Sequence, residues 1–274
     1  MINYKYKIYV PSGNPTALVL KMERDIEKRR KINDELMNKY DFVEQVGFIN
    51  EDNNKPELLM AGGEFCGNAT RSAVNYYLNG REGNIKIKVS GVKNKLNAGI
   101  DKDNNVWVDM PIIKGDYNKS IKVIDSKKAI IKLYGITQLI YEVKDINKKY
   151  NKEELKEYAY NILKNNNLLD ESAAGVMFIE NKGDKILLSP IVFVKEINTL
   201  FYETACGSGS VAVGIYKSFK DKRNINIDII QPSGDIINVK TIVDDKKIYN
   251  ARISGKVKEL EVKEWKKILL NIKI

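Results

Sequence analysis

The chain contains no histidine and only two cysteines, Cys66 and Cys206. Without histidine the usual zinc ligand sets cannot be assembled, and two cysteines do not make a disulfide framework. No apolar run is long enough for a transmembrane helix, and the first residues lack the apolar segment of a signal peptide. We therefore expect a cytoplasmic protein with no metal site and no membrane association.

Arginine is also scarce, because most of the 46 basic residues are lysines. The formal net charge is +10, which by itself would suit a nucleic-acid-binding protein. However, phosphate and base recognition favour arginine, and the lysines here alternate with Glu, Asp and Asn instead of clustering. The charge therefore indicates a solvated surface, and we expect a small-molecule partner and no nucleic acid.

Strand-like patterns dominate the 274 residues. Alternating or short continuous apolar runs predict strands at 2–10, 84–92, 106–110, 129–134, 138–143, 175–180, 185–194, 225–231 and 235–243. Helical spacing of apolar residues on a charged background predicts amphipathic helices over 23–40 and 152–166. Two further helices are predicted to start at the cysteines, over 66–79 and 206–219, and both begin with small residues.

The two cysteine-headed helices resemble each other. Superposing Cys66 on Cys206 places Gly67 on Gly207, Asn68 on Ser208, Thr70 on Ser210 and Tyr76 on Tyr216. The segments on either side hold similar numbers of predicted strands and helices. We therefore predict an α+β fold made by duplication, with a first lobe over 1–115, a second over 116–262 and a cleft between them. Residues 263–274 have an amphipathic pattern, and we expect them to form a C-terminal extension that packs back on the first lobe.

A cysteine at a helix start meets free backbone N–H groups and the positive end of the helix dipole, and both favour the thiolate. The glycine that follows lets a ligand approach the backbone. A single buried cysteine is often only a small apolar residue. Two such cysteines in matched halves point to chemistry instead. One thiolate would remove a proton from carbon while the other thiol delivers a proton to the opposite face, which inverts the stereocentre.

No cofactor motif competes with this interpretation, because the chain lacks a P-loop, a dinucleotide-binding glycine motif and a pyridoxal-type lysine context. We therefore expect no cofactor. A redox pair of thiols stays open as an alternative, although the CxxC spacing of dedicated redox proteins is absent.

At these residues the chain resembles the diaminopimelate epimerase superfamily. The segment "CGNATRS" (66–72) is similar to the first cysteine motif of that superfamily, and "ETACGSGSVAVG" (203–214) to the second. The segment "SGNPTALVL" (12–20) resembles its Gly-Asn substrate-binding turn. The resemblance implies two pseudo-symmetric lobes, each a mixed sheet or barrel wrapped around a central helix, with the active site between them. It also implies a homodimer.

The resemblance also implies the site residues. Cys66 and Cys206 would be the catalytic proton-transfer pair, and the backbone of Gly67, Asn68, Gly207 and Ser208 would bind the substrate carboxylate. Asn14 and Gln45 would line the site. Glu203 and Thr204 would hold the substrate amino group or order the turn, although here they stand one residue closer to the cysteine than in the usual epimerases.

Departures from the family pattern concern the far end of the substrate. The polar residues with which diaminopimelate epimerases hold a second charged end are missing, and Phe201 and Tyr202 appear on the approach to Cys206. The motifs "AGGEFCGNATRS" and "YETACGSGS" are most similar to the histidine racemase branch, which supplies metallophore biosynthesis. Glu44, Gln138 and Glu203 are the candidates to face an imidazole.

The predicted function is therefore a cofactor-independent amino-acid racemase with two cysteine bases, acting on histidine. Diaminopimelate or another amino acid, such as proline, is the alternative substrate within the superfamily. A non-catalytic ligand-binding or redox protein on the same fold is the alternative of a different class. The paired cysteines argue against the phenazine-biosynthesis-type isomerases, which do not depend on them.

Overall fold

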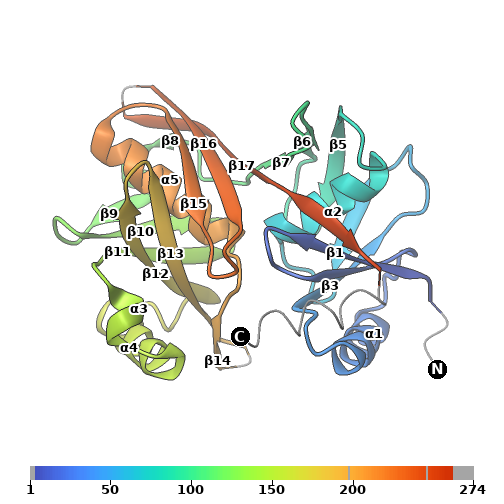
Figure 1. Ribbon diagram of the computed structural model, residues 1–274, viewed down its shortest axis with the longest axis horizontal. Helices are drawn as coiled ribbons and strands as arrows, with labels where there is room; N and C mark the ends of the chain where they lie inside the picture. Colours follow the sequence, from blue (N-terminus) through green and yellow to red (C-terminus); the bar gives the residue numbers. More distant parts are fainter. Residues whose placement is uncertain (1–3, 197, 245, 262–274) are drawn as a thin grey trace. The chain divides into compact units, whose positions relative to one another are not determined.

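The computed structural model describes residues 4–196, 198–244 and 246–261 (Figure 1). The four predicted helices are present within these residues, with bounds that differ by a few residues from the predicted ones. The helices are α1 (Ile26–Lys39), α2 (Gly67–Tyr77), α3 (Ile146–Lys149), α4 (Lys152–Asn165) and α5 (Gly207–Asp221), and a short 3-10 helix covers Tyr117–Lys119. None of the described helices is long and apolar enough to cross a membrane.

The chain forms two compact units, which correct the predicted boundaries. The first unit comprises the described residues up to Trp107 and those from Lys256 onward, and the second is Val108–Gly255. The predicted division at 115 is too late, because β8 (Gly115–Asp116) pairs with β17 (Lys247–Gly255) of the second unit. Residues 256–261 were expected in the second lobe, but β18 (Val257–Leu260) pairs with β1 (Tyr6–Pro11) of the first unit. The predicted extension, 263–274, lies outside the described residues.

In the first unit, the strands form one mixed sheet. Its order is β18, β1, β2, β3, β4, β5, β6, in which β2–β3 and β4–β5 are parallel and the other neighbours antiparallel. Besides β1 and β18, these strands are β2 (Thr16–Val19), β3 (Gln45–Ile49), β4 (Glu57–Met60), β5 (Gly83–Val89) and β6 (Leu96–Ile100), and β7 (Val106–Asp109) follows them in the chain.

In the second unit, the order is β9, β10, β11, β12, β13, β15, β16, β17, β8, and β14 pairs with the far half of β13. The pairs β11–β12 and β13–β15 are parallel. The bounds not yet given are β9 (Ile121–Val123), β10 (Lys128–Leu133), β11 (Ile136–Glu142), β12 (Ala173–Lys182), β13 (Lys185–Val194), β14 (Thr199–Tyr202), β15 (Ile225–Ile230) and β16 (Ile236–Asp244).

The two units repeat one topology. The run of pairings β1–β2–β3–β4–β5–β6 alternates antiparallel and parallel in the same sequence as β10–β11–β12–β13–β15–β16. A helix lies in each parallel connection, as parallel strands require a crossover. The internal duplication predicted from the cysteine motifs is therefore present in the strand pairing.

Each unit holds one helix inside its curved sheet. Helix α2 contacts β1 to β6 and β18, and α5 contacts β10 to β12 and β15 to β17 (Figure 1). Small residues make this burial feasible: a Cβ on Gly214 of α5 would lie 2.5 Å from Cγ1 of Val239. The composition of the cysteine-headed helices is thus explained by close packing on several sides.

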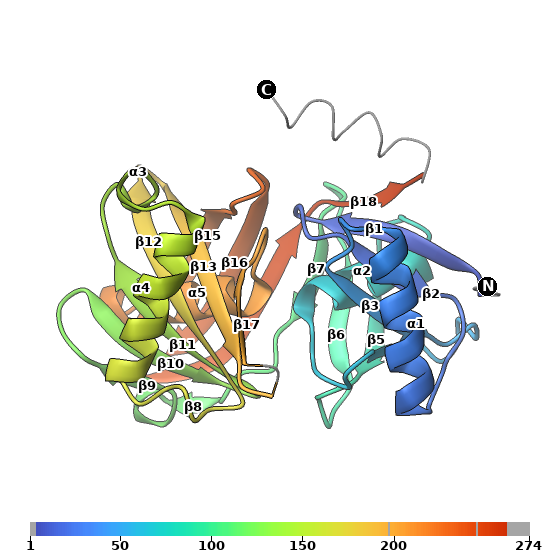
Figure 2. The ribbon, with the colours of Figure 1, turned by 90° about the horizontal axis from the view of Figure 1, so that it is seen from below.

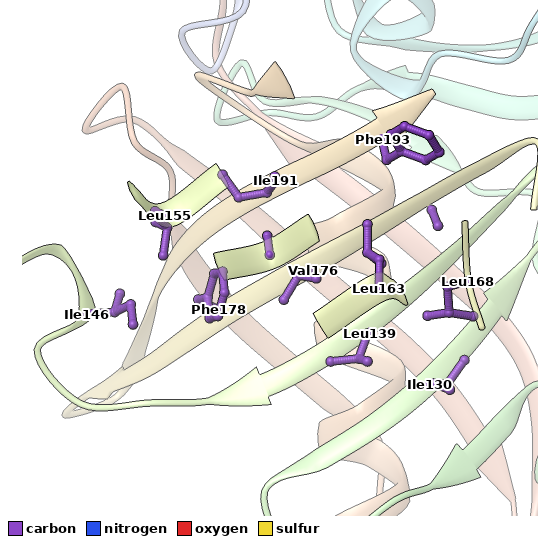
Figure 3. Close-up of a cluster of buried hydrophobic side chains, with 12 residues drawn as sticks. Ile130, Leu139, Ile146, Leu155, Leu163, Leu168, Val176, Phe178, Ile191 and Phe193 are labelled. Carbon is purple, nitrogen blue, oxygen red and sulfur yellow. The ribbon is translucent and has the colours of Figure 1, made fainter. Parts of the chain in front are cut away.

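One helix packs on the outer face of each sheet (Figure 2). Helix α1 buries Ile32 and Leu36 against residues of β1 to β3, and α4 buries Leu155, Ala159 and Leu163 against the other unit's sheet. Figure 3 shows the second of these clusters, in which α4 side chains lie over Leu139, Val176 and Phe178 of β11 and β12. The amphipathic patterns of 23–40 and 152–166 therefore mark the outer helices.

Candidate active site

Cys66 caps the N-terminus of α2. Its extended backbone (φ −132°, ψ 117°) turns the sulphur back over the first turn, where Sγ accepts from the Ala69 N–H at 3.4 Å. The Cys66 carbonyl accepts from the Thr70 N–H at 2.9 Å and the Thr70 hydroxyl at 2.7 Å. The thiol is half-buried and lies at the helix end where an anion is stabilised.

A chain of side-chain hydrogen bonds ends on this thiol. The Cys66 S–H donates to Gln45 Oε1 at 2.9 Å, and Gln45 Nε2 donates to Asn14 Oδ1 and, at 2.8 Å, to the Thr16 hydroxyl. Asn14 Nδ2 in turn donates to the Glu44 carboxylate. A carboxylate can only accept, so Glu44 sets the direction of both amides and leaves an acceptor facing Cys66.

Beside Cys66, α2 carries a buried arginine. Arg71 is 0% exposed, and its guanidinium donates to Asn68 Oδ1 at 2.9 Å and to Ser12 Oγ at 3.2 Å. Ser12 and Gly13 have φ values of 50° and 86°, so the turn before Asn14 is left-handed. Arg71 therefore ties the predicted substrate-binding turn to the first turn of α2.

Cys206 caps α5 with the same geometry. Its backbone is extended (φ −116°, ψ 106°), and Sγ accepts from the Gly209 N–H at 3.2 Å. The Cys206 carbonyl accepts from the Ser210 N–H at 3.0 Å and the Ser210 hydroxyl at 2.6 Å, as Cys66 does with Thr70. The alignment of the two motifs by sequence is thus reproduced bond for bond.

The surroundings of the second thiol differ from those of the first. The Cys206 N–H donates to Gln231 Oε1 at 3.0 Å, and Sγ lies 3.5 Å from Ser208 Oγ. Burial raises the pKa of the Cys206 thiol well above its ordinary value, and the Glu203 carboxylate, which accepts from the thiol, raises it further. The Ser208 hydroxyl and the Gly209 N–H act in the opposite direction. Burial and the Glu203 carboxylate therefore both favour the protonated form of the Cys206 thiol.

The structure brings the predicted site residues together within each unit. Asn14, Gln45 and Cys66 are hydrogen-bonded in sequence, and Gly67 and Asn68 form the first turn of α2. Around Cys206, Glu203 and Ser208 act on the thiol, whereas Thr204 lies in a turn where its carbonyl accepts from the Ser233 N–H at 3.0 Å. Within the described part of the chain, no three Cys, Asp or Glu side chains gather as metal ligands.

Several residues of these networks were not predicted. They are Ser12, Thr16, Arg71 and Gln231. Ser12, Thr16 and Arg71 carried a signal, because they stand inside the quoted "SGNPTALVL" and "CGNATRS" motifs. Gln231 directly follows β15, 25 residues after Cys206, so its contact with the Cys206 N–H depends on the strand pairing.

Comparison with known proteins supports a racemase. Residues 3–260 match the family described as the histidine racemase CntK N-terminal domain. The chain belongs to this family. The histidine racemase of Fusobacterium nucleatum is 30% identical over 234 residues, which cover 82% of this chain and 84% of that one. The protein is thus an isomerase that racemises or epimerises an amino acid.

Solved structures with the same fold extend over nearly the whole chain. A predicted epimerase from Pseudomonas aeruginosa has a TM-score of 0.65 at 12% identity and covers 94% of this chain and 98% of that one. A phenazine biosynthesis protein of the PhzF family from Bacillus anthracis has a TM-score of 0.62 at 15% identity, covering 94% and 97%. At these identities the similarity concerns the fold alone.

Proposed function

We propose that the protein racemises histidine without a cofactor, with Cys66 and Cys206 as the two proton-transfer groups. The observation that carries this proposal is the pair of thiols. The only two cysteines of the chain cap equivalent helices in two units of the same topology. Packing alone gives no reason for this match, whereas inversion of a carbon centre needs one proton-transfer group for each face.

In the proposed reaction, one cysteine thiolate takes the α-proton, so that the Cα–H bond breaks and an S–H bond forms. The electron pair moves into the carboxylate, which becomes enolate-like, and the thiol of the other cysteine gives its proton to the opposite face. The mechanism requires both sulphurs to reach the same α-carbon. After turnover, the protonated and deprotonated cysteines have exchanged roles, so the same site serves the reverse direction.

The substrate carboxylate would bind to the first N–H groups of the cysteine-headed helices. In α5, the Gly209 N–H donates to Cys206 Sγ and the Ser210 N–H to the Cys206 carbonyl. Gly207 and Ser208 carry the first two N–H groups of the helix, which precede the intrahelical bonds. Such groups, at the positive end of a helix, bind anions and stabilise developing negative charge. Gly67 and Asn68 would act in the same way in α2.

Glu203 would bind the substrate ammonium group. Its negative charge raises the pKa of the Cys206 thiol in the free protein. A bound ammonium would neutralise that charge and so favour thiolate formation when substrate is present. Substrate binding would in this way favour the thiolate of Cys206, which is the form that acts as the base.

Histidine is the proposed substrate because the family and the relative from Fusobacterium nucleatum are described as histidine racemases. The departures from diaminopimelate epimerases support the same substrate. The duplicated topology and the paired cysteines support membership of their wider superfamily, which is part of the proposal. A place in metallophore biosynthesis and a homodimeric state belong to the same proposal. Light scattering after gel filtration would measure the latter.

The test is a chiral-chromatography screen of L-amino acids that includes histidine, proline and L,L-diaminopimelate. We expect D-histidine to form and the α-proton to exchange with solvent in D₂O. Faster turnover of another amino acid would replace histidine but keep the two-thiol mechanism. If no amino acid racemises, and mild oxidation only joins the thiols in a reversible disulfide, the protein is a redox or binding protein.

A further inference from the structure

Gln138 links the sheet of the second unit to the Cys206 thiol. It lies on β11 with 0% exposure, and its Nε2 donates to Ser208 Oγ at 3.0 Å. Ser208 Oγ is 3.5 Å from Cys206 Sγ. The amide, the hydroxyl and the sulphur therefore form one line of contacts from a buried strand to the thiol.

The amide determines which way the serine hydroxyl points. A serine oxygen has one proton to donate and two lone pairs to accept with. Because Gln138 occupies one lone pair as a donor, the hydroxyl proton is directed away from it, and the Cys206 sulphur is the neighbouring acceptor. Once Cys206 is a thiolate it can only accept, so Ser208 must be the donor in this pair.

The strand next to Gln138, β12, has a glycine where the Gln138 amide needs space. Gly175 on β12 is its register partner, and a Cβ there would lie only 2.2 Å from Gln138 Oε1. That oxygen is buried with no partner among the described residues, which is unfavourable. An apolar side chain would suit the strand core better, so the amide is explained by the bond that it makes to Ser208.

The first unit offers a counterpart. Its equivalent strand pair, β2 and β3, aligns Thr16 with Gln45, as β11 and β12 align Gln138 with Gly175. In both pairs one glutamine addresses the cysteine at the start of the enclosed helix. Gln45 faces Cys66 directly with its oxygen, whereas Gln138 faces Cys206 through Ser208 with its nitrogen.

We propose that Gln138 is a positioning residue for Cys206, which holds the Ser208 hydroxyl in the orientation that donates to the thiolate. This inference rests on the proposed function, in which Cys206 alternates between thiol and thiolate. Ser208 and the Gly209 N–H are then the donors to the sulphur, and the Glu203 carboxylate is the charged group that opposes the thiolate.

The test measures the thiol itself and needs no substrate. In a Cys66→Ala background, Cys206 is the single cysteine, so its rate of alkylation by iodoacetamide can be followed by intact mass across a pH series. We expect Gln138→Met and Ser208→Ala each to move the midpoint of this profile to higher pH. The double variant should move it no further than Ser208→Ala alone, because both changes remove one contact.

Ser210→Ala is the matched control, since this serine of the same helix turn bonds to the Cys206 carbonyl and not to the sulphur. We expect the midpoint of its alkylation profile to equal that of the Cys66→Ala parent. Additive shifts, or no shift in Gln138→Met, would overturn the proposal. Gln138→Asn, which keeps an amide too short to reach Ser208, is the second variant. If neither replacement at 138 folds while Ser208→Ala does, Gln138 is structural and the proposal is wrong.

These outcomes are separate from the proposed function. Alkylation profiles that shift as expected in a protein that racemises no histidine would leave the role of Gln138 intact and refute only the substrate. Histidine racemisation with unshifted profiles would refute only the role of Gln138.

Discussion

The two cysteine sites have the same backbone conformation, but different side chains face the two sulphur atoms. Both thiols cap a buried helix, and both accept from the N–H three residues later. Cys66, however, is half-buried and faces a fixed amide oxygen, whereas Cys206 is 2% exposed and contacts both a carboxylate and a hydroxyl. Duplication thus conserved the position of the thiol while each unit set its own donors and acceptors.

The largest expected effect comes from removing either thiol. Cys66→Ser and Cys206→Ser should each lower kcat/KM for racemisation by about 10²- to 10⁴-fold, the usual contribution of a general acid or base. Chiral chromatography in both directions measures this loss. A variant that kept normal racemisation would show that its cysteine is not part of a two-base pair.

Packing under the second thiol gives the next effect, on stability. A Cβ on Gly209 would lie 2.2 Å from Met177 Sδ and 3.0 Å from Cys206 Sγ. We expect Gly209→Ala to lower the free energy of unfolding by about 1–3 kcal/mol, as overpacking does. The matched change in the first unit, Ala69→Gly, should lower it by only about 0.5–1 kcal/mol. Calorimetry measures both; equal losses would contradict the assigned difference in packing.

The carboxylate beside Cys206 predicts a pH effect. Glu203→Gln removes a charge that raises the pKa of the thiol, so the alkylation midpoint in the Cys66→Ala background should move to lower pH. Glu153→Gln, on the exposed face of α4 in the same unit, is the control and should leave it unchanged. An unmoved midpoint in Glu203→Gln would show that burial alone raises the pKa.

The same shift predicts how stability varies with pH. Because burial raises the pKa of Cys206 above that of the unfolded chain, the folded state binds this proton more tightly. The contribution of this proton to the free energy of unfolding is fully present at pH values below the pKa of an ordinary thiol. It is lost as the pH rises through the pKa of Cys206 in the folded protein. Urea titrations should therefore show a steeper alkaline loss for the parent than for Cys206→Ala. Parallel curves would contradict a raised pKa in the folded state.

The smallest expected effect is on the alkylation rate of Cys66. Replacing Gln45 should make Cys66 easier to alkylate, whereas replacing Gln138 should make Cys206 harder to alkylate. Gln45 accepts from the Cys66 thiol and so favours the protonated form. In a Cys206→Ala background, Gln45→Met should speed alkylation of Cys66 by about fivefold, which corresponds to ~1 kcal/mol for one hydrogen bond. Thr16→Val, which loses only the hydroxyl that accepts from Gln45, should change the rate less. Slower alkylation in Gln45→Met would mean that Gln45 serves as a donor.

Sequence patterns predicted the long elements better than the short ones. Strands such as β13 and β16 and the outer helices α1 and α4 follow from alternation and helical spacing. Strands β2, β3 and β4 were not predicted, because four or five mostly buried residues carry no periodicity. The boundaries of the first unit were misplaced because they depend on long-range pairing: β8 pairs with β17 of the second unit, and β18 pairs with β1 of the first.

The sequence by itself determined the duplication, the two cysteines at helix starts and the family to which the chain belongs. Those features can be read from short segments of the sequence, because the two Cys-Gly motifs repeat at a fixed offset and each precedes a run of small residues. Tertiary structure alone decided which group faces each thiol. Gln45 and Gln138 reach their cysteines from strands paired in register. Gln45 presents its oxygen because Asn14 and Thr16 accept from its nitrogen, whereas Gln138 presents its nitrogen because the Ser208 hydroxyl accepts from it.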